Sequence, residues 1–364
     1  MSVENLTENE SLPIENSVAE NKSKFANPML WIQLITFILG FALLVFVIYR
    51  IGLHTLFDAF ARIGWGFLAI VALNGARHFI RALCMYIAVP VRHRSFKYRY
   101  AVSARLAGEA VSFLTFTGPL LGEATKAALL KKRIPLSHGV TAVVVDNILY
   151  DISVALLILG GVGVMFYVYG GGDSPAMRDV LYGVATVAAL TIVAIIVAAK
   201  SRFKPLSWTL KKLSARGWLP RFMETKQRGV YELEDNIHEL YANRKTTFFS
   251  MFGLIILSHV LSVVEVYAAL HMLGETTVQA STAYIIESLT KVINFAFGFV
   301  PGTVGVYEGG NGIILHSLGY PTATGVTLAL VRRGAILFWT IIGLVILLWR
   351  GVARGTQHLT RRES

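Results

Sequence analysis

Residues 180–199 read VLYGVATVAALTIVAIIVAA, a run without a single charged side chain. A helix needs about 20 apolar residues to cross the hydrocarbon core of a bilayer. Similar runs cover residues 29–49, about 64–90, 136–168, 246–272 and 322–349. The six runs predict an all-α, polytopic integral membrane protein with six full spans.

The composition supports this fold class and excludes others. The 364 residues are 54% apolar and 15% charged, with a mean hydropathy of +0.58, whereas a soluble domain is about 25% charged. The only cysteine, Cys84, lies within an apolar run, which excludes a disulfide scaffold. No Walker loop, dinucleotide fingerprint, zinc spacing or nucleophile elbow is present, so we expect neither a cofactor nor a metal.

The apolar runs divide the protein into three parts. Residues 1–28 are polar and acidic, and they predict a disordered cytoplasmic tail. Residues 29–349 form a single membrane domain, whose first run is too long for a signal-peptide core and is retained. Within it, the charged linker 200–245 predicts an amphipathic helix on the cytoplasmic surface. Residues 350–364 form a basic cytoplasmic tail.

The distribution of Lys and Arg predicts the orientation in the membrane. The tails and the segments 91–133 and 200–245 together carry 26 of these residues, and the opposite loops carry 3. The positive-inside rule then places both termini on the cytoplasmic side of the cell (plasma or inner) membrane. Positive charge beside membrane spans is typical of topology and anionic lipid, so the net charge of +12 does not indicate nucleic acid.

Two apolar regions, 99–132 and 279–319, are interrupted by Gly, Pro and charge. The first contains the sequence FTGPLLGE over residues 116–123, and the second contains FVPGTVGVYE over residues 299–308. A proline follows each, at Pro135 and Pro321, and the next intramembrane charge comes 11 residues later in both, at Asp146 and Arg332. The pattern predicts two re-entrant, broken helices in an inverted-topology repeat, about 29–168 and about 180–349. The expected gate residues are Gly118, Pro119, Gly122, Pro301, Gly302 and Gly305.

Many ionisable residues fall within the predicted spans, where each costs about 2.5–3.5 kcal/mol on insertion scales. Arg77 and Arg81 lie four residues apart and therefore on one face of a helix. A structural role is an alternative for each, because either arginine could pair with Asp146 or Glu265. Arg62, Arg105 and Lys126 are expected to reach the head groups at the interface.

The remaining charges define a predicted binding site. Broken helices expose backbone groups, which membranes tolerate only around a cavity. Helix N-termini and arginines there would favour phosphate, and carboxylates would bind an amine or a proton. The pattern predicts a site for an amphiphile with a charged head group. The expected head-group residues are Arg77, Arg81, Glu123, Glu308, Arg332 and Arg333, and those for pairing or proton coupling are Glu109, Asp146, Asp151, Glu265, Glu287 and Lys291.

The segment Pro301–Glu308, followed by Pro321 and Arg332, resembles the signature of the lysylphosphatidylglycerol synthase transmembrane (flippase-like) family. The segment Gly118–Glu123 with Lys126 resembles the other motif of that family, and the resemblance covers about residues 30–350. The first motif departs from the pattern: Leu120 and Leu121 replace small or polar residues, and Lys126 stands where Arg is usual.

The resemblance implies a membrane domain that moves lipids, or lipid-linked head groups, between leaflets. In two-part members a soluble aminoacyl-transferase domain follows and attaches lysine to phosphatidylglycerol. Here the sequence ends about 15 residues after the last span, so we expect a stand-alone member that is not an enzyme. The expected partners are membrane lipids, a second copy of the protein or enzymes of lipid synthesis, and not nucleic acid.

Two other classes of function stay open at this point. A membrane-embedded glycosyl or acyl transferase would use Asp146 and Asp151 as a metal-binding carboxylate pair. A secondary transporter of small solutes would share the inverted-repeat logic.

Overall fold

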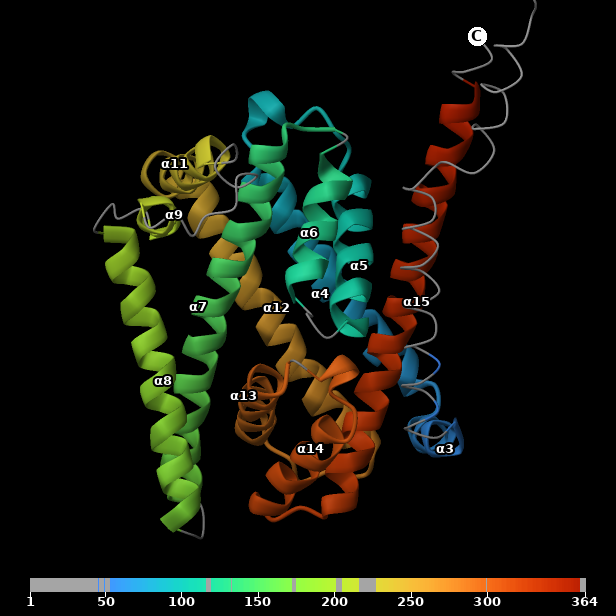
Figure 1. Ribbon diagram of the computed structural model, residues 1–364. Coiled ribbons are helices and arrows are strands. Elements are labelled where there is room, and N and C mark those ends of the chain that lie inside the picture. The colour runs from blue at the N-terminus through green and yellow to red at the C-terminus, as the bar shows by residue number, and fades with distance from the viewer. Residues whose placement is uncertain are drawn as a thin grey trace, which may run out of the picture. The chain divides into compact units, whose positions relative to one another are not determined.

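A computed structural model describes residues 45, 49, 53–115, 119–131, 133–171, 175–200, 205–215, 227–298 and 300–360. Gly40–Leu347 form one compact unit; Met1–Leu39 and Leu348–Ser364 form a second, of which the structure describes only the end of the last helix. The described part contains helices and no β-strand, which confirms the all-α prediction (Figure 1). The predicted tail 1–28 and nearly all of the predicted span 29–49 lie outside the described residues.

Five long helices are apolar enough to cross a membrane, as predicted for those segments. Their polar backbone groups bond within each helix, which is the condition for lying in hydrocarbon. Helix α8 exposes most of its apolar side chains and packs mainly on α7, as expected for a helix that faces lipid. The five are α4 (Gly66–Ala88), α7 (Leu136–Tyr169), α8 (Pro175–Lys200), α12 (Lys245–Met272) and α15 (Thr322–Thr360, apolar to Trp349).

The first broken region forms a helical hairpin of α5 (Tyr98–Leu114) and α6 (Pro119–Leu130). The two helices approach closely because Gly108 and Gly122 face each other. A Cβ atom on Gly122 would lie 2.6 Å from the carbonyl oxygen of Gly108 and would also collide with Ser112. The predicted gate residue Pro119 opens α6, and Gly118 lies outside the described residues.

The second broken region forms α13 (Ala280–Ala296), the short 3-10 turn η3 (Pro301–Thr303) and α14 (Val306–Ser317). The connection bends through positive φ angles at Gly302 (61°), Thr303 (49°) and Gly305 (83°). Glycine adopts these angles without strain, which explains its presence at two of the three positions. Glu308 accepts a 2.8 Å hydrogen bond from the N–H of Gly305 and so caps α14.

The same order of elements occurs twice: a long helix, a hairpin and a second long helix. It comprises α4–α5–α6–α7 in the first half and α12–α13–α14–α15 in the second. In Figure 1 the α5–α6 hairpin occupies the upper half of the view and the α13–α14 hairpin the lower half, with α12 running between them. Each half of the membrane domain therefore contributes two long helices and one hairpin.

The shorter helices are peripheral. They are α3 (Leu53–Ile63), η2 (Val91–His93), α9 (Pro205–Ala215) and α11 (Gln227–Asn243). Helix α11 covers the predicted amphipathic segment of the linker and packs on α7 and α12. Helix α9 packs on α11, where the backbone N–H and the hydroxyl of Ser207 both donate to Glu234.

Candidate functional site

A cavity of about 660 Å³ lies among the long helices, and both hairpins line it. Binding cavities for small ligands and head groups commonly have about 300–1,000 Å³. The cavity wall is unusually charged for the interior of an apolar protein. Its ionisable side chains are Arg77, His78, Arg81, Arg105, Glu109, Glu123, Tyr150, Asp151, Glu265, Lys291, Tyr307, Arg332 and Arg333.

Asp146 of α7 is the centre of a first group of ion pairs. Arg81 of α4 donates from Nε and Nη2 to the two carboxylate oxygens of Asp146, at 3.0 and 2.6 Å. Arg105 of α5 donates to the same carboxylate at 2.9 Å. The guanidinium of Arg81 also lies 4.1 Å from the ring centroid of Tyr150. All three ion-paired side chains are buried, so their mutual attraction offsets the desolvation cost that burial imposes on each charge.

The hairpin α5–α6 extends this group. Arg105 pairs with Glu109 at 3.0 Å, and Lys126 of α6 pairs with Glu109 at 2.6 Å and with Glu123 at 2.8 Å. We call the six residues the first network, in the order Arg81, Asp146, Arg105, Glu109, Lys126, Glu123. The signs alternate along it, and three cations balance three carboxylates.

The placement of Arg105 and Lys126 corrects an expectation from the sequence. Both were expected at the head-group interface, yet their residues are 6% and 1% exposed. The reason is the hairpin packing, which turns these side chains toward the carboxylates of Asp146, Glu109 and Glu123. The spacing contains the signal: Arg105 precedes Glu109 by four residues and Lys126 follows Glu123 by three, the spacings at which side chains meet on a helix. Arg62, by contrast, is exposed.

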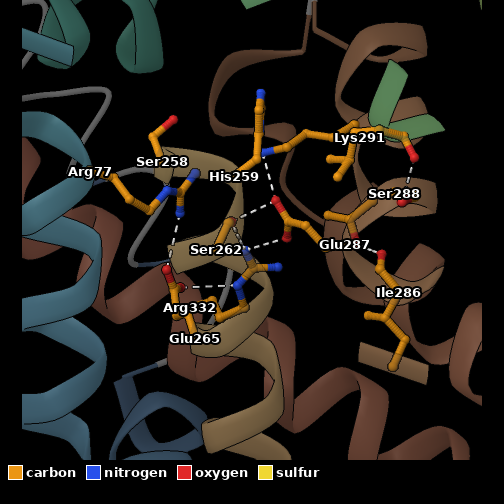
Figure 2. Close-up of polar contacts among 12 residues, drawn as sticks. Arg77, Ser258, His259, Ser262, Glu265, Ile286, Glu287, Ser288, Lys291 and Arg332 are labelled. Atoms are coloured by element: carbon orange, nitrogen blue, oxygen red, sulfur yellow. Dashed lines mark hydrogen bonds and ion pairs between the residues drawn. The ribbon is translucent and has the colours of Figure 1, made fainter. Parts of the chain in front are cut away.

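Arg332 of α15 is the centre of a second group of ion pairs (Figure 2). It donates from Nε to Glu265 of α12 at 3.1 Å and from Nη2 to Glu287 of α13 at 2.7 Å. Arg77 of α4 donates to the other oxygen of Glu265 at 3.0 Å, and Lys291 pairs with Glu287 at 2.7 Å. We call these five residues the second network, in the order Arg77, Glu265, Arg332, Glu287, Lys291.

Ser262 of α12 contacts the second network without any indication in the sequence. Ser262 donates a 2.6 Å hydrogen bond to Glu287 and accepts one of 3.3 Å from Arg332. His259 bonds the hydroxyl of Ser153 at 2.8 Å and stacks on Tyr150, which agrees with a packing role. Serine is common in membrane helices as a packing residue, so its residue type gives no signal of this role.

Four positions of each network correspond, with the signs of charge reversed. In each half, a charged residue on the first long helix pairs with a central residue on the second long helix. The central residue also pairs with a residue on the first hairpin helix. That residue in turn pairs with a residue of opposite charge four positions later on the same helix. Asp146 and Arg332, the two central residues, each lie 11 residues after a proline. The corresponding pairs are Arg81 and Glu265, Asp146 and Arg332, Arg105 and Glu287, and Glu109 and Lys291.

The two networks differ in net charge. The first is neutral, whereas the second holds three cations and two carboxylates and therefore one excess positive charge. The excess comes from Arg77, which lies outside the four corresponding positions. Within the described part of the protein, Nη1 of Arg332 is buried and has no hydrogen-bond partner. The second network is thus positive, and it contains a buried N–H donor without a partner.

Arg333, next to Arg332, contacts the second hairpin instead of joining the second network. It donates to the carbonyl oxygens of Gly302 and Thr303, pairs with Glu308 and lies 5.1 Å from the ring centroid of Tyr307. These contacts fasten the bent connection of the second hairpin. Of the predicted head-group residues, Arg81 and Arg333 are therefore engaged with protein groups, and Glu308 caps α14 rather than lining the cavity.

Asp151 is the remaining predicted carboxylate. It is exposed, lines the cavity and forms no ion pair among the described residues. The charges that act on it most are those of Arg81, Glu123 and Asp146, all of the first network. Asp146 is occupied by two arginines, and no cluster of three or more His, Cys, Asp or Glu suited to a metal ion occurs in the described part of the protein.

Comparison with known proteins gives one match. Residues 32–343 match the family model described as the lysylphosphatidylglycerol synthase TM region. No curated protein and no solved structure matches the sequence. The matched range contains both networks and both hairpins.

Proposed function

We propose that this protein, which belongs to the lysylphosphatidylglycerol synthase transmembrane family, moves a lipid with a charged head group between the leaflets of the cell membrane. The observation that carries the proposal is the charged cavity of about 660 Å³ that lies among apolar, membrane-length helices. A site of this kind suits a head group, while the acyl chains of the same molecule stay in the surrounding hydrocarbon.

The charge distribution supports a transport cavity over a purely structural core. Buried ion pairs alone would hold helices together, but packing apolar residues would do so equally well or better. Here Arg77, which is partly exposed, and Asp151, which forms no ion pair among the described residues, both line the cavity in the middle of α4 and α7, where a charge is costly. Intramembrane charges that face a cavity are typical of substrate pathways.

The two hairpins suggest how the cavity changes access. In an inverted-topology repeat, one half rocks against the other around a site at the midplane. The repeated order of helices and the matching ion-pair positions support such a repeat. The distribution of Lys and Arg supports the cytoplasmic side for both termini. The bent connection of the second hairpin touches α5 of the first half. Movement at this contact would open the cavity to one leaflet and close it to the other.

Vesicles that contain the purified protein and a fluorescent phospholipid test the proposal. A membrane-impermeant quencher removes the signal of the outer leaflet alone unless lipid crosses the bilayer. We expect a protein-dependent loss beyond that fraction, and a slower loss with Glu308→Gln, because Arg333 then loses the ion pair that helps fasten the second hairpin. Leu257→Trp, at an exposed apolar position of α12, serves as the control. No extra loss with anionic, zwitterionic or polyprenyl lipids would contradict the proposal.

A further inference from the structure

We propose that the second network binds one singly charged phosphodiester, held between Arg77, Arg332 and Lys291. The inference rests on the proposed function and specifies the head group that the cavity takes. It is carried by a difference in charge between two networks that otherwise correspond position by position.

The excess charge of the second network is the first step. The four corresponding residues of each network sum to zero, and Lys126 with Glu123 adds a neutral pair to the first. Arg77 adds a cation to the second and nothing there balances it. An uncompensated charge inside a membrane protein is costly unless a counter-ion or water reaches it. One monoanion restores neutrality.

The second step is that donors are available where this charge lies. Arg332 is 4% exposed, and its Nη1 has no hydrogen-bond partner in the described part of the protein. Arg77 has a side chain 21% exposed and gives one bond to Glu265, and Lys291 also lines the cavity. Figure 2 shows the three cations around the carboxylates of Glu265 and Glu287. Guanidinium groups present N–H donors in the fork geometry that matches phosphate oxygens.

The three cations come from three different helices and lie close together. Glu265 bridges Arg77 of α4 and Arg332 of α15, and Glu287 bridges Arg332 and Lys291 of α13. The three cations are therefore neighbours through shared carboxylates, and the charge of Arg77 acts on Lys291. An anion between them relieves this repulsion and contacts both halves of the repeat at once.

The carboxylates beside the first network set the limit of one charge. Asp151 has no ion pair among the described residues, and Oε2 of Glu123 is buried without a hydrogen-bond partner there. These carboxylates repel a second negative charge on the same head group. A phosphodiester carries one charge, whereas a phosphomonoester carries two above its second pKa of about 6. The cavity therefore distinguishes phosphodiester from phosphomonoester lipids.

Binding to the purified protein in detergent tests the inference without requiring transport. A ligand that binds the folded state raises the unfolding temperature. At a pH of about 8, where a phosphomonoester is doubly charged, we expect stabilisation by short-chain phosphatidylglycerol, weaker stabilisation by short-chain phosphatidic acid and none by diacylglycerol. The deacylated glycerophosphodiester separates a lipid head group from a free phosphodiester: competition by it at equal concentration shows that the phosphate alone is recognised.

Variants that change the charge count decide the mechanism. Arg77→Gln makes the second network neutral, and we expect phosphatidylglycerol to bind at least about tenfold more weakly. Arg77→Lys keeps the charge and restores binding. Lys131→Met removes an exposed cation at the end of α6 and is the matched control.

Three results would overturn the inference: unchanged binding in Arg77→Gln, equal binding of both phosphate classes, or equal weakening by Arg77→Gln and Lys131→Met. Arg77 is partly exposed, and the comparison of the two phosphate classes uses the unaltered protein, so the test stays valid even where Arg77→Gln fails to fold. Lipid movement in vesicles without any dependence on Arg77 would leave the proposed function standing and remove this inference. Charge-dependent binding without lipid movement would do the reverse.

Discussion

The two ion-pair networks have the same arrangement and opposite signs. Where the first places Asp146 between two arginines, the second places Arg332 between two glutamates. A buried charge needs a partner of opposite charge, and both networks supply one. We therefore attribute the shared arrangement to the stability of the fold. The difference lies at the ends of the networks: the first closes with the neutral pair Lys126 and Glu123, and the second ends with an extra cation, Arg77. In our proposal, the ligand binds at the end that carries this extra cation.

The reversal of sign also explains how the halves contact each other. Arg77 belongs to α4 of the first half and pairs with Glu265 of α12 in the second. A repeat with unchanged signs would place an arginine at position 265, opposite Arg77, and like charges in a low-dielectric interior repel strongly. With reversed signs, the repeats attract across their shared boundary.

Removing the centre of each network gives the largest expected effect. Asp146→Asn leaves Arg81 and Arg105 without their shared carboxylate, and Arg332→Met leaves Glu265 and Glu287, both 0% exposed, each with one remaining ion-pair partner. We expect each change to lower the free energy of unfolding by about 3–5 kcal/mol, because each removes the shared partner of two buried charges. Unfolding in detergent measures this.

The control for the central residues is Asp58→Asn, which breaks the exposed pair of Asp58 with His54. Exposed pairs contribute about 0–1 kcal/mol. A loss below about 1 kcal/mol for one central residue and of several for the other would show that the two networks are not structurally equivalent.

The two hairpins differ in how closely their helices approach, and alanine substitutions test that difference. Gly122→Ala places a methyl group against the backbone oxygen of Gly108, which cannot move aside, whereas Gly310→Ala meets the flexible end of Ile293. We expect a loss of about 1–3 kcal/mol for the first and less for the second. Gly309→Ala, with no atom within 4 Å, is the control in the same unfolding experiment. Equal losses would contradict the closer packing of the first hairpin.

Neutralising the ends of the networks gives the smallest expected loss of stability. In Glu123→Gln, Lys126 keeps Glu109, and in Arg77→Gln, Glu265 keeps Arg332. Both side chains are partly exposed, and we expect each change to lower the free energy of unfolding by about 1–2 kcal/mol. Only Arg77→Gln should weaken phosphodiester binding. A matching loss of binding in Glu123→Gln would show that both ends hold the anion.

Much of this structure could be predicted from local patterns. Five of the long helices follow from uninterrupted apolar runs, and the break in the second hairpin follows from Pro301, Gly302 and Gly305. The equal spacing from proline to Asp146 and to Arg332 indicates that these two residues occupy corresponding positions of a repeat. Such features are local because a span and a turn depend on neighbouring residues.

The rest depends on contacts between distant segments. The sequence offers Asp146 and Glu265 as partners of Arg77 and Arg81 but leaves open which pairs with which, because these pairs join different helices and no periodicity in one segment contains them. For the same reason Lys126 was expected at the interface, since the depth of a hairpin depends on what it packs against. The distinction between Arg81, which is engaged with Asp146, and Arg77, which faces the cavity, needs the geometry of α7 and α12.

Filling the cavity tests the central claim most directly. Asn294 lines the cavity and takes part in neither network, so Asn294→Trp adds bulk there and removes no ion pair. In vesicles with a fluorescent phospholipid and an impermeant quencher, we expect the unaltered protein and Leu257→Trp to move lipid across the bilayer and Asn294→Trp to leave the inner-leaflet signal intact. Equal lipid movement in all three would contradict transport through this cavity.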